Sequence, residues 1–202
     1  MEILKRAVNF LSGNHADAET AARSPGGQGK LSREEVVQRL ETADGSDLGG
    51  FDLSGVDLSG LDLSRADLRD ADLSGADLRG SILRHVRLCG TRLTGANLSR
   101  ADLYDANCVT TGTRSPADFS RANLAEANLL GANLARFDLR GADLSGATLR
   151  EASLHLAELE GATLAGADLE GANLRHAKLS GADLSGADLR GSILRHVRLC
   201  GT

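Results

Sequence analysis

The side chains of this 202-residue chain that are best suited to chemistry are arginines and histidines in its last third. Arg-His pairs recur twenty positions apart, at 175–176 and 195–196. The candidate residues are Arg136, His155, Arg175, His176, Arg195 and His196. If a twenty-residue unit sets the fold, these residues line up as an anion-binding or pH-sensitive ridge, or else as an ordinary solvated face.

No catalytic or metal-binding motif accompanies these residues. No His stands with a Cys or an acid at a metal-ligand spacing, and no glycine-rich phosphate loop is present. Aromatic residues make up 2% of the chain and Trp is absent, which leaves almost no surface on which bases could stack. The sequence therefore predicts a protein with no catalytic residue, no cofactor, no metal and no direct nucleic-acid binding.

Three cysteines, at 89, 108 and 200, make an odd number without a metal-ligand spacing. Cys108 replaces a repeated Leu, whereas Cys89 and Cys200 occupy equivalent positions that we expect to face outward. We interpret them as spare thiols in a reducing compartment, with a redox or interchain disulfide role as the alternative. No apolar run approaches transmembrane length, and the N-terminus lacks a signal-peptide pattern, so the expected compartment is the cytoplasm.

A five-residue repeat, Ala-Asp/Asn-Leu-x-x, must position the candidate Arg and His side chains. Its Leu recurs at every fifth position from Leu48 to Leu103, Cys108 closes that series, and the repeat resumes from Phe119 to Leu199. A period of five matches neither a helix nor a flat strand. A chain that turns a corner every five residues buries each Leu, and Gly at many corners permits the turn. The pattern predicts a solenoid over residues 46–202.

The runs ADLSGADLRG (71–80), GANLSRADL (95–103) and SGADLSGADLRG (180–191) resemble the pentapeptide-repeat protein family. The resemblance implies an all-β solenoid, a right-handed quadrilateral β-helix with four repeats, or 20 residues, in each coil. It further implies that the central Leu and the small residue two positions before it point inward, while the other three positions point outward.

The first 45 residues have a different character. The pattern of residues 1–12 predicts an amphipathic helix. This helix is either a second cap or a loose tail of the solenoid. Alternatively, it is a docking peptide that binds a partner groove or a membrane surface. Its candidate contact residues are Ile3, Leu4, Val8, Phe10 and Leu11. Residues 13–31 are small, polar and Gly-rich, which is typical of a flexible linker. Residues 32–45 predict a helix with a Ser32–Glu35 capping box, expected to cover the open first coil.

The repeats are interrupted after Cys108. Residues 109–116 (VTTGTRSP) contain nothing suited to the solenoid axis, and Arg114 must point outward, so we expect a loop. Loops on regular scaffolds often carry function, and topoisomerase-protecting members of the resembled family carry such projections. A repeat that has drifted without acquiring a function is the alternative.

Residues 71–91 recur without change at 182–202, which indicates a duplication, natural or engineered. No capping helix follows the second copy, so we expect either a truncated chain or end-to-end self-association of the last coil. The candidate interface residues are Leu184, Leu189, Leu194 and Leu199.

The sequence favours two classes of function over an enzyme or a small-molecule binder. The first is a non-enzymatic protein–protein interaction or assembly scaffold. The second is a DNA-mimic-like protein that protects a type II topoisomerase (DNA gyrase) and so confers quinolone or toxin resistance, because Asp is frequent just before the repeated Leu and stacked acids resemble a duplex. The net charge of about −4 from residue 46 onward is small for such a mimic.

Overall fold

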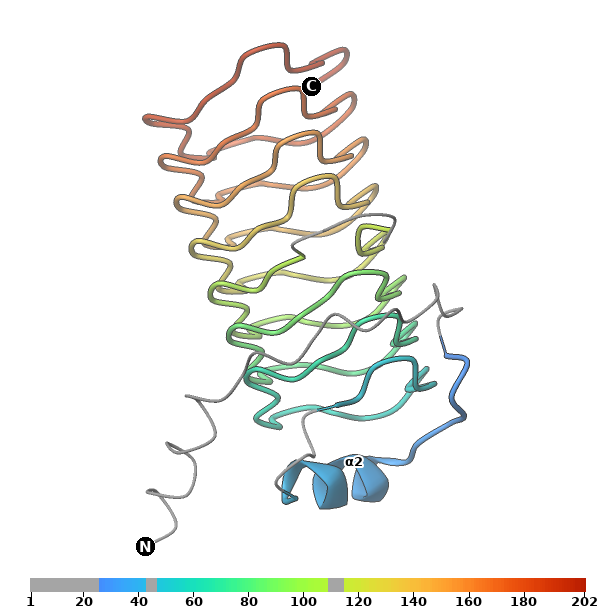
Figure 1. The fold of residues 1–202 in the computed structure, drawn as a ribbon. Helices are drawn as coiled ribbons and strands as arrows, with labels where there is room; N and C mark the ends of the chain where they lie inside the picture. The colour runs from blue at the N-terminus through green and yellow to red at the C-terminus, as the bar shows by residue number, and fades with distance from the viewer. Residues whose placement is uncertain (1–25, 43–46, 109–114) are drawn as a thin grey trace, which may run out of the picture.

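The computed structural model describes residues 26–42, 47–108 and 115–202. Over these ranges the chain winds into stacked four-sided coils, with one helix beneath the first coil and the C-terminus at the opposite end (Figure 1). The helix is α2 (Arg33–Leu40), and the rest of the regular structure consists of single-residue parallel β-bridges. The fold is thus a β-solenoid with very short sides.

Backbone hydrogen bonds join each coil to the next one. Asp52 forms a parallel bridge with Asp72, and Asp118 forms one with Asp138. The Leu53 amide donates to the Asp72 carbonyl oxygen at 2.7 Å, and the Asp72 amide donates to the Phe51 carbonyl oxygen at 2.9 Å. The same twenty-residue register recurs on all four sides, which confirms the predicted four repeats per coil.

The repeated Leu residues fill the axis of the solenoid. From Leu48 to Leu179 each repeated Leu is at most 2% exposed, and where Ala stands two positions earlier it is buried as well. Burial of a Leu side chain contributes about 2 kcal/mol. Because each coil covers only its neighbours, this contribution depends on an unbroken stack.

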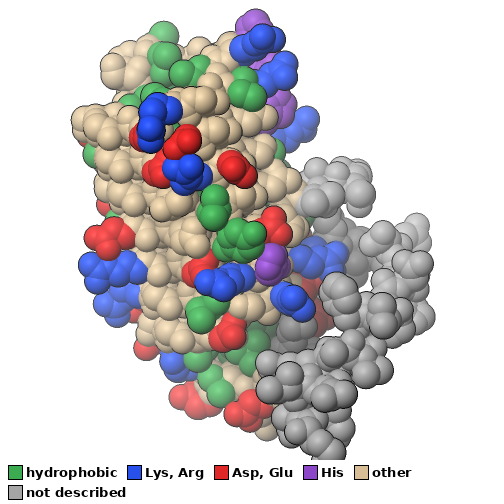
Figure 2. All heavy atoms as spheres, turned by 90° about the vertical axis from the view of Figure 1, so that its left-hand side faces the viewer, with side chains coloured by type: hydrophobic (Ala, Val, Ile, Leu, Met, Phe, Trp, Pro, Cys, Tyr) green, Lys and Arg blue, Asp and Glu red, His purple; other side chains and the backbone are tan. Residues whose placement is uncertain are grey.

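Each corner depends on a left-handed backbone residue and on a side-chain cap. Gly55 and Gly141 have φ angles of 67° and 65°, which Gly adopts without a Cβ clash. The Asp or Asn before the central Leu accepts a hydrogen bond from the amide two positions later, as Asp52 Oδ1 does from Ser54 at 2.9 Å. The remaining side chains spread over the outer faces, where Figure 2 shows charges of both signs intermixed.

Helix α2 closes the first coil. Ser32 is its N-cap, and both hydrogen bonds of the predicted capping box with Glu35 are present. Val36 is fully buried in the core, and the Arg33 guanidinium donates to the carbonyl oxygens of Asp57 and Ser59 at 2.7 and 3.0 Å. The helix therefore covers apolar surface and satisfies backbone groups that the first coil would otherwise leave open.

The sequence-based assignment of 13–31 to a linker is wrong for its last six residues. Gly26 donates to the Asp70 carbonyl oxygen, Gln28 donates to Gly50, and Lys30 forms a parallel bridge with Asp52. Backbone pairing against the first coils holds this Gly-rich stretch, which composition alone did not reveal. The predicted helix at 1–12, with its five candidate contact residues, lies outside the described residues.

The interruption of the repeats is a six-residue insertion at one corner. Arg92 bridges Asp118, 26 positions later, instead of the usual 20. The Gly90 amide donates to the Ser115 carbonyl oxygen at 2.8 Å, so Ser115 already occupies a regular corner position. The insertion therefore comprises residues 109–114. These residues, which include the candidate Arg114, lie outside the described residues. The predicted loop of 109–116 exceeds the insertion by two residues.

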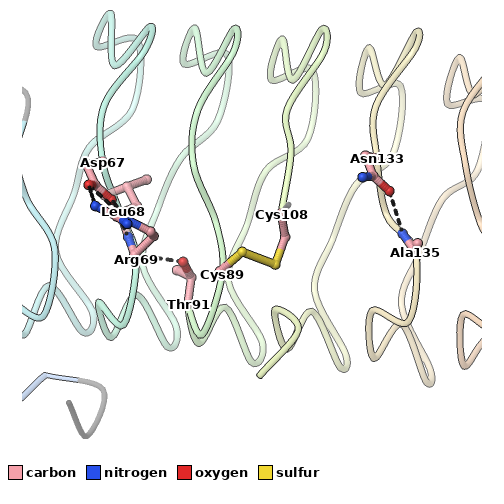
Figure 3. Close-up of a disulfide and its surroundings, with 8 residues drawn as sticks. All are labelled: Asp67, Leu68, Arg69, Cys89, Thr91, Cys108, Asn133 and Ala135. Carbon is pink, nitrogen blue, oxygen red and sulfur yellow. Dashed lines mark hydrogen bonds and ion pairs between the residues drawn. A yellow bond between two sulfur atoms is a disulfide. The ribbon is translucent and has the colours of Figure 1, made fainter. Parts of the chain in front are cut away.

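A disulfide joins the two coils that precede the insertion. Cys89 and Cys108 are bonded, their Cα atoms lie 4.7 Å apart, and both side chains are buried (Figure 3). The interpretation of Cys89 as an outward-facing spare thiol is therefore wrong, because the corner turns its side chain toward the next coil, where Cys replaces Leu. Cys200, at the equivalent repeat position, is a free and exposed thiol.

We expect Leu144→Asp to unfold several neighbouring coils. Leu144 is fully buried at the axis, and an unpaired carboxylate there costs several kcal/mol. Loss of β-type circular dichroism and a lower melting temperature would report the change. Leu156→Asp is the matched control because Leu156 is 38% exposed, and a Leu144→Asp protein as stable as this control would contradict the buried axis.

Reduction of the disulfide should destabilise the solenoid. The bond spans 19 positions, for which chain-entropy arguments give about 3 kcal/mol. Thermal unfolding with and without dithiothreitol measures the loss, and a Cys89→Ala/Cys108→Leu variant should no longer respond to the reductant. Titration of three free thiols in the native, unreduced protein would show that the bond does not form.

Candidate interaction surface

One corner of the solenoid carries both the insertion and the Arg/His side chains. After the insertion this corner consists of residues 135–136, 155–156, 175–176 and 195–196, which we call the basic corner. Its amides continue the stack: Arg136 donates to the His155 carbonyl oxygen at 2.9 Å, and His176 donates to that of Arg195 at 3.0 Å. The structure thus brings together all six residues of the predicted ridge.

The three histidines form a continuous array along the rod. The rings of His176 and His196 are stacked with their centroids 4.8 Å apart, and the ring of His155 meets that of His176 edge-on at 5.7 Å. His155 Nδ1 lies 3.0 Å from the Arg175 carbonyl oxygen. The pKa of His176 lies below its usual value because desolvation, and then the charges of His196, His155 and Arg175, disfavour the imidazolium.

The arginines of this corner differ from most others in the molecule. Four arginines at the corner or on the side beside it form no ion pair within the described ranges: Arg136, Arg175, Arg195 and Arg198. Elsewhere Arg79, Arg140 and Arg190 each pair with the Asp two positions earlier, at 2.5 to 2.7 Å. Within the described ranges, most of the arginines without an ion pair therefore lie at one place on the surface.

A hollow of about 470 Å³ opens at the basic corner. It is lined by His176, His196, Leu156, Val197, Lys178 and Arg198. Lys178 is paired with Glu158 at 2.5 Å, whereas Arg198 remains unpaired. Sequence analysis did not select Lys178 and Arg198 as candidates, although their twenty-residue spacing places them in one column beside the histidines. Figure 2 shows His and basic side chains gathered toward the C-terminal end of the rod.

The acidic columns have internal partners. Arg69 binds the Asp67 carboxylate. Burial of Asp67 raises its pKa, but the hydrogen bonds from Arg69 and the charges of Arg69 and Arg87 together outweigh burial and lower it. Asp168, Glu170 and Asp188 form the kind of carboxylate cluster that can hold a cation. However, Arg150 lies 2.5 Å from Glu170, and Arg190 lies 2.7 Å from Asp188. Guanidinium groups thus already balance these carboxylates.

The four Leu residues of the candidate end-to-end interface differ in how far the structure exposes them. Leu184 and Leu189 are partly buried against the core, while Leu194 and Leu199 are 42% and 50% exposed. Self-association through these four residues stays a prediction. None of the helices in the described part of the chain has the length and apolar character needed to cross a membrane.

Comparison with solved structures places the fold among known repeat proteins. A trypsin-treated variant of QnrB1, a plasmid-mediated fluoroquinolone resistance protein, is 28% identical, with a TM-score of 0.64 over 76% of this chain and 78% of that one. Full-length QnrB1 is 29% identical, with a TM-score of 0.55 over 76% and 79% of the two chains. HetL from the cyanobacterium Nostoc sp. strain PCC 7120 is 28% identical over 83% and 96%, with a TM-score of 0.25.

The search of curated proteins finds no match. The family model for pentapeptide repeats matches eight copies, at residues 43–75, 71–107, 117–155 and 157–195. These ranges cover most of the chain, and the gap between 107 and 117 contains the insertion. The chain belongs to the pentapeptide repeat family, and its fold is the right-handed β-helix of that family.

Proposed function

We propose that this protein is a non-enzymatic protein-binding scaffold that recognises its partner through the basic corner. The observation that carries the proposal is the concentration of unpaired arginines on one corner of a rod whose other arginines are mostly ion-paired. Charges that are already paired contribute little to a new contact, whereas unpaired guanidinium groups are free to bind a partner.

The surface of the rod favours binding over catalysis. Its hollow combines two apolar side chains with histidines and cations, and none of the residues that line it is a Ser, Thr, Cys, Asp or Glu. Adjacent coils display their side chains at about 4.8 Å intervals, a spacing suited to an extended contact along the rod. The chain leaves the regular repeats after Cys108 and returns at Ser115 on this same corner, and interruptions of a regular scaffold often carry function.

A second candidate function is protection of a type II topoisomerase against fluoroquinolones. It is supported by the similarity to QnrB1 at 28% identity and a TM-score of 0.64. The pairing of acids with arginines weakens the part of this hypothesis that relies on duplex mimicry, because a mimic needs uncompensated negative charge. A topoisomerase contact would then rely on the basic corner rather than on the acidic columns.

Site-specific photo-crosslinking tests the proposed scaffold function. A photoreactive amino acid at Leu156, on the basic corner, should capture one protein partner in cells that produce the protein. The matched controls are Glu126 and Glu151, which are exposed corner residues with the same positive φ on other corners. Capture of the same proteins from all three positions, or of none from Leu156, would contradict recognition through the basic corner.

A gyrase supercoiling assay tests the second candidate. If the protein protects the enzyme, adding it should restore supercoiling in the presence of a fluoroquinolone, and Arg136→Asn/Arg175→Gln/Arg195→Gln should lose this effect. Asn is chosen at Arg136 because the φ angle of 65° there suits Asn better than most residues. An unchanged fluoroquinolone response would eliminate topoisomerase protection and leave the scaffold proposal standing.

A further inference from the structure

The basic corner presents cations in a row rather than in a cluster. Arg175 and Arg195 occupy the same position in consecutive coils, and Arg136 lies on the same corner two coils before His176. Consecutive coils are about 4.8 Å apart, whereas an extended peptide advances about 3.3 Å per residue. Long arginine side chains can span that difference, so a row of this kind suits an extended anionic segment better than a single small anion.

The chemistry of the row favours carboxylates. Guanidinium groups bind carboxylates through two parallel hydrogen bonds, and the arginines of this molecule already do so with their own Asp residues: Arg190 Nε and Nη2 both donate to the Asp188 carboxylate, at 2.7 to 2.9 Å. The arginines of the basic corner have the same chemistry but form no ion pair with any residue that the structure describes. A partner that supplies carboxylates would form with these arginines the same Arg–carboxylate ion pair that Arg and Asp form elsewhere on the surface.

The surroundings of the row favour a peptide over a nucleic acid. Leu156 and Val197 line the hollow beside the cations and give aliphatic side chains of a peptide a place to pack. The chain carries a net charge of −5 and has 2% aromatic residues, so it lacks both the long-range attraction and the stacking surfaces that nucleic acids use.

From these observations we propose that the basic corner binds an acidic, carboxylate-rich segment of a partner protein, and that the three histidines strengthen this binding when they are protonated. The proposal rests on the protein-binding function proposed above and names the chemical class of the partner. In this proposal the arginines supply a positive charge that does not depend on pH, and the histidines add positive charge only when they are protonated.

The direction of the pH dependence follows from the groups that face the histidine array. Those groups are Arg175, Arg195, Lys178, Arg198 and Glu158, of which only Glu158 is acidic, and it is paired with Lys178. In the free protein this environment disfavours the imidazolium of His176. A bound carboxylate would favour it, so binding takes up protons and affinity rises as the pH falls.

Fluorescence anisotropy with a labelled oligoglutamate peptide tests the proposal on the full-length protein. Arg136→Asn/Arg175→Gln/Arg195→Gln should weaken binding by about tenfold or more, because three charge-assisted contacts are lost. The matched control, Arg84→Gln/Arg100→Asn/Arg121→Asn, removes the same net charge from other corners and should bind within about twofold of the unmodified protein. Thermal unfolding of both variants verifies that each is folded.

The histidine contribution is measured by comparing about pH 8 with about pH 6, a range over which histidine titrates. The unmodified protein should bind the peptide at least about threefold more tightly at the lower pH. His155→Asn/His176→Asn/His196→Asn should lose this difference while retaining binding at the higher pH. A pH dependence that survives the triple His variant would overturn the role assigned to the histidines.

If the peptide binds, two outcomes would still overturn the acidic-peptide proposal. One is equal weakening by the corner variant and the matched control, which would indicate a general charge effect. The other is tighter binding of a single-stranded oligonucleotide of equal charge, which would assign the corner to nucleic acid. If the peptide fails to bind while photo-crosslinking from Leu156 still captures a partner, the class of partner is wrong and the scaffold function stands. If both fail, both proposals fall.

Discussion

The whole molecule depends on the packing of one Leu every five residues, so that four of these side chains meet at the axis of each coil. To bring each Leu inside, the chain must turn after every repeat, and each turn requires a left-handed residue and a capped amide. The coil-to-coil hydrogen bonds then form one residue at a time, because each side is only one repeat long. No side has enough pairing to stand alone, so the stack is stable only as a continuous column.

This constraint separates two populations of side chains. Inward positions are confined to Leu, Ala and a few substitutes such as Phe119 and Cys108, whereas outward positions are free to vary. Much of the outward charge is used within the molecule, since Asp carboxylates cap turns and bind Arg at the same time. Among the described residues, most of the arginines that lack this internal pairing lie at or beside the basic corner, which also lies above the point where six residues are inserted. Departures from regularity in sequence, backbone and charge therefore coincide on one corner.

The sequence predicted those features that depend on period alone. The buried Leu column, the glycine corners and the Ser32–Glu35 capping box follow from spacing. The family resemblance supplied the four repeats per coil, and with them the alignment of Arg175 with Arg195 and of His176 with His196. The disulfide did not follow, because the direction of Cys89 depends on how its corner faces the next coil. The turn-capping role of the acidic columns did not follow either, since a count of Asp does not show that a carboxylate also caps a turn and binds an Arg. Pairing of residues 26–31 with the first coils likewise depends on tertiary contacts that a Gly-rich composition conceals.

The chemical reactivity of the arginines tests most directly whether those at the basic corner are available to a partner. Brief treatment of the native protein with phenylglyoxal, followed by mass spectrometry of its peptides, ranks the guanidinium groups by how freely each can react. The account predicts fast modification of Arg136, Arg175, Arg195 and Arg198, and slow modification of ion-paired residues such as Arg69, Arg140 and Arg150. Equal rates for the two groups would show that the basic corner is no more available to a partner than the rest of the surface.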